Sequence, residues 1–593
     1  MKKITVRNEE VRLPRENAGP EDSRNGTRSI AIVLTADAVL GERIASELGR
    51  GLNGIQARAV PLESHEAVTA IGEGRPALVV LAPGEARAKD RPHRLSAIAN
   101  AMQACVDHGV ERLILISSGA IYGPDHHLTG FVPEGKHRRA RVDNAEADWW
   151  QVVEERAQRR LDGISESRML VLRTPLICGS GGNHFIDRII RRRFLIRYAG
   201  FNPPLQVLSA SALGKAIGEA FGRQLSGTCH VATDDVVPLL SLLRCKRVRS
   251  IALPRTLQRI LRPLLFRYLD GVETSDQLDY LRYPWTLSGE KFARETGLRF
   301  SSRTALAEIG AETTTEPHPD SHAGLPEFDR FGSDPSFYQR QSKSIFRFAE
   351  KSYWRIESRG FEHLPRNGPA IIVGPHRGFM PLDAVMMFHL VYRYTGRVVR
   401  FLIHPTLVKF PFQARFFQQM AGVMACKTNA ERVLADGDIL GVYPEGIAGA
   451  FKLYREAYNL GGFGRSDYAR WALKHNVPVI PFVIVGSTEI FPIFGRLKWR
   501  WLKEWLEWPF FPITATFPFL PFPLPTKWHM QFLPPVHPID IKAEAERLKR
   551  DPVAVFTEKV RIALDFATQE MLRRRRSIFF GNIWPVSNGG SAQ

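Results

Sequence analysis

The sequence predicts an α/β protein built from two sheet-containing units that are joined by a linker. In the first half, short apolar runs alternate with helical stretches, and these runs lie at 30–34, 77–81, 112–117 and 169–173. The second half repeats the alternation, with apolar runs at 370–373, 439–442 and 477–485. Strands that alternate with helices are typical of parallel sheets covered by helices. Residues 313–334 are rich in Thr, Pro, His, Gly and Asp and are predicted to be the linker.

A chain of 593 residues is too long for one hydrophobic core, so more than one domain is expected. The predicted organisation is a disordered N-terminus, a first α/β domain, the linker, a second α/β domain and a basic tail, at 1–27, 28–312, 313–334, 335–570 and 571–593. The five cysteines are scattered without metal-ligand spacing, which indicates reduced thiols in the cytoplasm and no metal site.

The charge of the chain predicts a polyanionic partner. Lysine and arginine number 81 against 61 acidic residues, which gives a formal net charge of +20. Nucleic acid, an anionic membrane surface and phosphorylated substrates all fit such an excess. No nucleic-acid-binding motif accompanies the charge, so a nucleic-acid partner is not expected.

The uncharged segment 508–526 has the length of a membrane span but the wrong composition. It contains six prolines, which remove backbone donors and break a helix repeatedly. Its aromatic residues suit the wall of a hydrophobic tunnel or contact with a lipid interface.

The most informative motif places a histidine and an aspartate around one strand-to-helix turn. His376 follows the buried strand predicted at 370–373, and Asp383 falls in the first turn of a helix predicted over 381–394. A carboxylate at that position is favoured by the helix dipole and can orient the histidine. The pair predicts a general base that works without a serine nucleophile, although a lone histidine after a strand is more often structural.

The first half carries three segments of a known pattern: a strand and turn at 30–41, Leu-Ile-Ser-Ser-Gly-Ala-Ile-Tyr-Gly at 115–123, and Leu-Arg-Thr-Pro-Leu-Ile-Cys-Gly at 172–179. This pattern resembles the extended short-chain dehydrogenases/reductases, which include NAD-dependent epimerases of nucleotide sugars. The resemblance implies a Rossmann-like domain over 28–312.

Two departures from that family count against NAD(P) binding. In the loop that should approach the pyrophosphate only Gly41 remains, and Asp37 adds a negative charge. The family's Tyr-x-x-x-Lys pair is replaced by Trp150 and Glu154, which leaves Tyr122 without a lysine partner. We therefore expect that oxidoreductase chemistry is lost; binding of another ligand and a scaffold role both stay open.

The second half carries four sequence blocks in a fixed order, preceded by Gly-Phe-Glu-His-Leu-Pro. The blocks lie at 376–383, 412–427, 443–446 and 477–482. Together they resemble the glycerolipid (lysophospholipid) acyltransferase superfamily, and within it the mono- and diacylglycerol acyltransferase-like subgroup. The resemblance implies an α/β acyltransferase domain over 335–570.

The resemblance also implies a mechanism. His376 would remove the proton from an acceptor hydroxyl that attacks the thioester of acyl-CoA or an acyl carrier protein, and Asp383 would fix the histidine tautomer. No metal and no further cofactor is required. The implied substrate-binding residues are Gly378, Lys427, Pro444, Glu445 and Gly446.

Two departures leave the acceptor open among lysophosphatidate, an acylglycerol and another lipid alcohol. Six residues separate His376 from Asp383, where four are usual in the superfamily. Lys427 stands where the superfamily usually has an arginine, and a lysine lacks the planar guanidinium that binds phosphate through two hydrogen bonds. Simple structural roles also fit: Glu445 as a helix cap and Lys427 as an ordinary surface lysine.

Three stretches combine basic residues with apolar bulk, at 244–267, 494–508 and 573–576. Each Lys or Arg near an anionic leaflet contributes ~1 kcal/mol, so clusters of this size favour peripheral attachment to the inner, cytoplasmic face of a membrane.

Two alternatives to acyl transfer remain at the level of sequence. One is an NAD-dependent epimerase or dehydratase-like enzyme with an accessory second half, and the other is a non-catalytic lipid-binding protein. The sequence predicts no oligomeric state.

Overall fold

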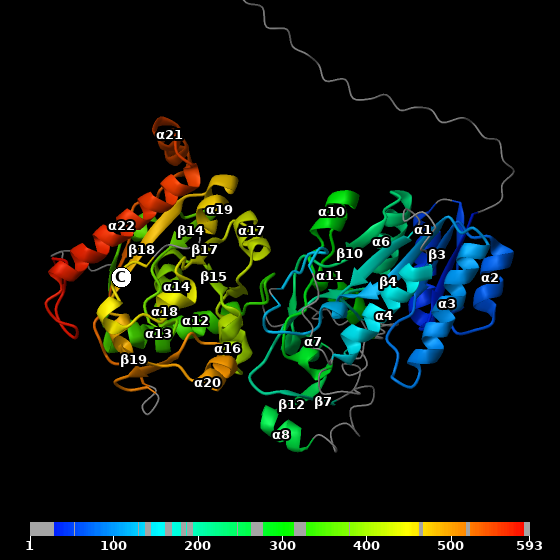
Figure 1. The fold of residues 1–593 in the computed structure, drawn as a ribbon, viewed down its shortest axis with the longest axis horizontal. Helices are drawn as coiled ribbons and strands as arrows, with labels where there is room; N and C mark the ends of the chain where they lie inside the picture. Colours follow the sequence, from blue (N-terminus) through cyan, green and yellow to red (C-terminus); the bar gives the residue numbers. More distant parts are fainter. Residues whose placement is uncertain are drawn as a thin grey trace, which may run out of the picture.

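The computed structural model shows two α/β units side by side, the first in blue to green and the second in green through yellow to red (Figure 1). It describes residues 29–585 apart from 53, 129, 137–143, 161–168, 179–185, 187–193, 246, 262–276, 314–327, 379, 462–465 and 518–521. The predicted disordered N-terminus, most of the predicted linker and the last eight residues lie outside the described part.

The first unit is built on a six-stranded parallel sheet with strand order β10-β5-β4-β3-β1-β2. Its strands are β1 (Ser29–Thr35), β2 (Ile55–Pro61), β3 (Leu78–Ala82), β4 (Arg112–Ser118), β5 (Met169–Thr174) and β10 (Gly227–His230). All four apolar runs predicted as strands are confirmed. Continuous apolar runs predict such strands well because helices bury both faces of a parallel sheet.

Two helix layers cover this sheet. Residues of α1 (Ala38–Gly51) and α6 (Ala210–Gly222) share one buried cluster with the sheet. Residues of α2 (Glu66–Gly74), α3 (Arg91–Asp107) and α4 (Ala145–Arg160) share the cluster on the other face. The sheet with helices on both faces confirms the predicted Rossmann-like class.

Smaller elements complete the first unit. The short helices and turns are η1 (Gly119–Tyr122), α7 (Leu239–Cys245), α8 (Arg255–Ile260), η3 (Gln277–Leu281), α10 (Glu290–Thr296) and α11 (Ser302–Thr313). Three two-stranded sheets are formed by β6 (Leu176–Ile177) with β9 (Val207–Leu208), β7 (Phe194–Tyr198) with β12 (Arg249–Leu253), and β8 (Pro204–Leu205) with β11 (Val237–Pro238).

The second unit is built on a seven-stranded sheet of order β13-β21-β18-β14-β17-β15-β16, parallel except between β18 and β21. Its strands are β13 (Glu357–Arg359), β14 (Ala370–Val373), β15 (Val399–Ile403), β16 (Gly422–Met424), β17 (Ile439–Val442), β18 (Val479–Val485) and β21 (His529–Phe532). The expected α/β class of the second half is thereby confirmed.

Helices again cover both faces. One buried cluster joins the sheet to α17 (Lys427–Ala435), α19 (Asp467–His475), α21 (Pro538–Leu548) and α22 (Pro552–Arg574). The other joins it to α12 (Pro335–Lys343), α13 (Ile345–Phe348), α14 (Leu382–Thr395), α16 (Gln413–Gln419) and α18 (Gly446–Ala450). The remaining elements are η4 (Ala349–Tyr353), η5 (Phe361–His363), α15 (Pro405–Lys409), η6 (Tyr454–Glu456), η7 (Thr488–Ile490), β19 (Ile493–Leu497), α20 (Arg500–Leu506) and β20 (Phe511–Thr514).

Two predicted connecting segments contain packed residues. In the linker, Phe328 and Phe331 are buried. In the basic tail, α22 continues to Arg574 and Trp584 is buried in the core. Both segments therefore contribute to packing in their described parts.

In segment 508–526, β20 pairs with β19, and the described residues contain no helix. Across the described chain, none of the helices combines the length and the apolarity that crossing a bilayer requires.

The two units touch through backbone as well as side chains. The Phe412 amide donates to the Gly200 carbonyl at 2.8 Å. Gly200 has a φ of +79°, and a Cβ there would lie 2.5 Å from the Phe412 nitrogen, so only glycine fits this contact. Elsewhere on the boundary, His126 Nε2 lies 2.8 Å from Glu507 Oε1.

Candidate active site

The predicted pair of His376 and Asp383 is joined in the structure. His376 follows β14, and Asp383 lies in the first turn of α14. The imidazole Nδ1 donates to Asp383 Oδ2 at 2.9 Å. The backbone amide of Arg377 donates to the same oxygen at 2.9 Å, and that of Ala384 donates to Oδ1 at 2.8 Å. These donors hold a fully buried carboxylate in one orientation, and Nε2 of the histidine is left as the basic nitrogen.

The aspartate also sets the basicity of the histidine. Burial lowers the pKa of His376, but the charge and hydrogen bond of Asp383 raise it more, so that its pKa lies above the ordinary value. A raised pKa makes the imidazole a stronger proton acceptor.

The longer spacing between His376 and Asp383 is accommodated by Gly378. Its φ is +102°, a conformation that favours glycine, and a Cβ there would lie 3.3 Å from the Ser487 carbonyl oxygen. Gly378 therefore shapes the loop beside His376. It is not among the residues that line the adjacent cavity, and its role in substrate binding stays a prediction.

A cavity of about 430 Å³ opens beside His376, at the carboxyl ends of β14, β15 and β17. Its inner wall is apolar and buried, with contributions from Val385, Ile403, Phe417, Met420 and Phe451. Part of its polar lining comes from α17 and α19 and includes the exposed side chains Lys427, Asp467, Arg470 and Lys474. An apolar interior behind a charged opening suits a fatty acyl chain attached to an anionic carrier.

Glu445 is not a helix cap. It occupies the position before α18 without a capping hydrogen bond. Its Oε1 accepts from the Gly461 amide at 2.8 Å and pairs with Lys452, whose pKa is lowered by burial despite this carboxylate. Its Oε2 is buried, and none of the described residues forms a hydrogen bond with it.

Pro444, Gly446 and Lys427 line the cavity as predicted. Gly446 has a φ of +55°, and the place where its Cβ would be faces open space, so a substrate has room there. Lys427 is exposed in the first turn of α17.

The family model described as Acyltransferase matches residues 355–485, which include the His376 loop and Glu445. An uncharacterised protein of Mycobacterium tuberculosis is 34% identical over 261 residues, which cover 43% of this chain and 72% of that protein. The chain is an acyltransferase of the same family as this mycobacterial protein.

More distant relatives have named activities. The DGAT1/2-independent enzyme synthesizing storage lipids of Homo sapiens is 28% identical over 163 residues, covering 27% of this chain and 50% of that enzyme. Phytyl ester synthase 2 of Arabidopsis thaliana is 30% identical over 141 residues, covering 22% of this chain and 20% of that protein.

Among solved structures, MoeE5 in complex with UDP-glucose and NAD matches with 17% identity and a TM-score of 0.36, covering 48% of this chain and 98% of that chain.

Sequence reasoning missed Tyr443 as a site residue of the acyltransferase. Its ring centroid lies 5.0 Å from that of His376, and it lines the cavity. The hydroxyl is buried without a hydrogen-bond partner among the described residues, and burial raises its pKa well above the ordinary value. Its position directly before Pro-Glu-Gly was the available signal.

Arg377 was missed as well. Its side chain is 1% exposed and donates to the carbonyl oxygens of Ala457 and Tyr458, the latter at 3.4 Å. Burial lowers its pKa. The guanidinium ties the loop behind His376 to segment 457–458, a contact between residues that are 80 positions apart and that no local pattern indicates.

The described residues of the Rossmann-like domain are poorly suited to a dinucleotide. The N-terminus of α1, where a pyrophosphate would bind, is capped by Asp37, which accepts from the Leu40 amide at 3.0 Å. Gly41 instead allows close packing, because a Cβ there would meet Thr35 at 2.3 Å. The cavity at this strand edge measures about 40 Å³, whereas cofactor pockets span roughly 300–1,000 Å³.

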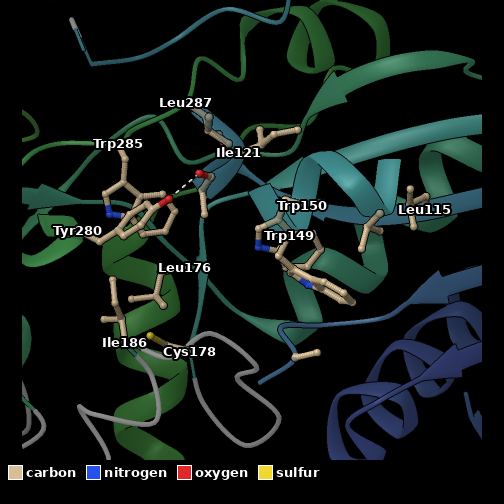
Figure 2. Close-up of a cluster of buried hydrophobic side chains, with 14 of the residues drawn as sticks. Leu115, Ile121, Trp149, Trp150, Leu176, Cys178, Ile186, Tyr280, Trp285 and Leu287 are labelled. Atoms are coloured by element: carbon tan, nitrogen blue, oxygen red, sulfur yellow. Dashed lines mark hydrogen bonds between the residues drawn. The ribbon is translucent and has the colours of Figure 1, made fainter. Parts of the chain in front are cut away.

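Aromatic packing and an ion pair occupy the place of the missing catalytic pair. Trp149 and Trp150 pack within the buried cluster of Figure 2, and the Trp150 indole donates to Glu146 at 2.8 Å. Glu154 pairs with Arg173 at 2.7 Å, and Arg173 in turn donates to the Tyr122 hydroxyl at 2.7 Å. Tyr122 is thereby held in a structural network, and burial raises its pKa.

Proposed function

We propose that this acyltransferase moves a fatty acyl group from acyl-CoA or an acyl carrier protein to a lipid hydroxyl, with His376 as general base. The observation that carries the proposal is the His376–Asp383 pair, 2.9 Å apart, at the wall of a largely apolar cavity of about 430 Å³. The relatives named for storage-lipid and phytyl-ester synthesis support a lipid acceptor.

The proposed reaction proceeds by direct transfer. Nε2 of His376 accepts the proton as the acceptor oxygen attacks the thioester carbonyl carbon. The tetrahedral intermediate collapses to an ester, the carbon–sulfur bond breaks, and the imidazolium returns its proton to the leaving thiolate. Asp383 stabilises the imidazolium in between, and such a positioned base contributes about 10²–10⁴-fold in rate.

We propose two roles for the predicted substrate-binding residues. We assign Glu445 and Gly446 to the acceptor head group, because Oε2 of Glu445 has no hydrogen-bond partner among the described residues and the space at Gly446 is open. Gly446 lines the cavity, and Glu445 lies directly before it outside the lining. We assign Lys427 to the phosphates of the donor or acceptor, because it is exposed beside Arg470 and Lys474 in the same lining.

We further propose peripheral attachment to the cytoplasmic face of an anionic membrane. Trp499, Trp501 and Trp505 on and beside α20 are 54%, 61% and 59% exposed. Lys498, Arg500 and Lys503 alternate with them. The elements α20, α8, β7 and β12 all lie along the lower edge of Figure 1, so two of the three predicted stretches face the same side. Exposed tryptophans among cations are typical of an interfacial anchor.

The test measures transfer of a labelled acyl group from acyl-CoA and from acyl carrier protein to lysophosphatidate, monoacylglycerol, diacylglycerol and long-chain alcohols in liposomes. We expect transfer to one acceptor class and its loss in His376→Ala, with exposed His537→Ala as the matched control. Lipid binding without transfer to any acceptor would indicate a non-catalytic lipid-binding protein instead.

A further inference from the structure

A second, larger cleft lies on the boundary between the two units. It has a volume of about 620 Å³ and is lined by α7 from the first unit and by α12 and α16 from the second. In Figure 1, α7 and α16 face each other across the boundary. The cleft is separate from the catalytic cavity, because Phe416 of α16 lines the cleft whereas its neighbour Phe417 lines the cavity.

The charge of this cleft is positive. Arg244 from α7, Arg340 from α12 and Arg415 from α16 line it. Asp334 is the one carboxylate among its lining residues within the described chain, and it is already engaged by the Phe337 amide at 2.9 Å and the Ser336 hydroxyl at 2.7 Å. The arginines therefore exceed the available negative charge.

Two of these guanidinium groups lack partners within the part of the chain that the structure describes. Neither Arg244 nor Arg415 forms an ion pair or a side-chain hydrogen bond there, and Arg340 reaches only the Ser336 hydroxyl at 3.3 Å. Outside the lining, Arg197 of β7 lies near Arg415: burial lowers the pKa of Arg197, and the charge of Arg415 lowers it further. Guanidinium groups that line one cleft are stabilised by an anion bound between them.

An apolar surface accompanies the cations. Phe412, directly before α16, is 67% exposed and lines the cleft together with Phe337 and Phe416. Its φ is +64°, which is strained for a bulky residue, and its amide is held by Gly200 of the first unit. A free phosphate ion would contact the arginines but not this phenylalanine. A lipid with a phosphate head group would contact both the arginines and the phenylalanine.

We propose that this cleft binds the phosphate head group of an anionic phospholipid, with an acyl chain lying along Phe412. The site spans both units, so it gives the first unit a role in lipid recognition that needs no dinucleotide. Because α16 is a wall of both cavities, a lipid bound here contacts the helix that also supports the acyl cavity.

Vesicle flotation tests the site independently of acyl transfer. Binding to phosphatidylcholine vesicles is compared with binding to phosphatidylcholine vesicles that contain phosphatidic acid. Loss of two phosphate contacts in Arg244→Ala/Arg415→Ala is expected to weaken the binding gained from phosphatidic acid by roughly 30-fold. Binding to phosphatidylcholine alone should remain, since the tryptophans of α20 are intact.

The matched control is Arg547→Ala/Arg561→Ala, which removes the same charge from exposed positions on α21 and α22. We expect this control to retain most of the gain from phosphatidic acid. An equal loss in both double variants would show that only the net charge matters and would overturn the proposal. The single variant Arg244→Glu, at an exposed position, provides a second test should the double variant fold poorly.

Soluble ligands identify the source of the phosphate. Thermal unfolding is followed with inorganic phosphate, coenzyme A and water-soluble dihexanoyl phosphatidic acid. We expect stabilisation by the short-chain lipid that is lost in Arg244→Ala/Arg415→Ala and weakened in Phe412→Ala. Equal stabilisation by inorganic phosphate, or stabilisation by coenzyme A that depends on these arginines, would overturn the lipid assignment.

Discussion

His376 Nδ1 and Asp383 Oδ2 lie 2.9 Å apart, and among the described residues every other hydrogen bond to that carboxylate comes from a backbone amide of the same loop or helix turn. The carboxylate thus accepts three hydrogen bonds and donates none. An amide side chain cannot reproduce this arrangement, because its NH₂ group would face a donor wherever it points.

Asp383→Asn is therefore expected to lower the transfer rate by about 10²–10⁴-fold, the contribution of a positioned general base. The pH profile of kcat/KM should change too. Asp383 raises the pKa of His376, and the base acts in its deprotonated form. Without the carboxylate the pKa falls, so the acidic limb of the profile should move to lower pH. An unchanged acidic limb would assign that limb to another group. Exposed Asp540→Asn is the control.

Tyr443→Phe is expected to separate stability from activity. The buried hydroxyl has no partner among the described residues, and an unsatisfied buried polar group costs about 1–3 kcal/mol. Removing it should leave the free energy of unfolding unchanged or raise it, as measured by urea denaturation. The transfer rate should fall, because Tyr443 lines the cavity beside His376 and we expect its unpaired hydroxyl to bind the substrate. Full activity in this variant would assign Tyr443 a packing role.

Local sequence predicted those features that a single segment determines. The strand predicted at 439–442 is observed with the same limits, because its residues are apolar and a parallel sheet buries both of its faces. Asp383 was found because histidine and carboxylate share one turn between a strand and a helix.

Features built from distant segments could not be predicted. Glu445 was weighed as a helix cap because its bonds to Lys452 and Gly461 depend on how the intervening loop folds back. The arginines of the boundary cleft lie on three helices that come together only when both units are packed. The sequence pattern of a single helix does not indicate that its arginine will meet arginines from other helices.

The size of the acyl cavity gives a prediction about chain length. Val385 lies on α14 in the apolar wall and is 4% exposed. Val385→Phe adds bulk into the cavity, so transfer from long-chain acyl-CoA should decrease while transfer from short-chain acyl-CoA is retained. The ratio of kcat/KM for the two donors measures the effect, and the short-chain donor serves as the internal control. Equal losses with both donors would place the acyl chain elsewhere.

Arg575 ties the end of α22 to the loop region behind the active site. Its guanidinium pairs with Glu489 at 2.5 Å, and the two side chains are 7% and 4% exposed. Glu489 also accepts a hydrogen bond from the Tyr458 hydroxyl. The backbone carbonyl oxygen of Tyr458 in turn accepts a hydrogen bond from the Arg377 guanidinium. Replacing the arginine leaves a buried carboxylate without its counter-ion.

Arg575→Met is accordingly expected to lower the free energy of unfolding by about 3–5 kcal/mol, the usual cost of breaking one partner of a buried pair. Urea denaturation measures this loss. Arg576→Met, one residue further on and exposed, changes the charge equally and should have little effect. Arg575→Met/Glu489→Gln removes both charges and should recover part of the stability. Equal destabilisation by Arg575→Met and Arg576→Met would mean that the net charge of this segment, and not the buried pair, holds it in place.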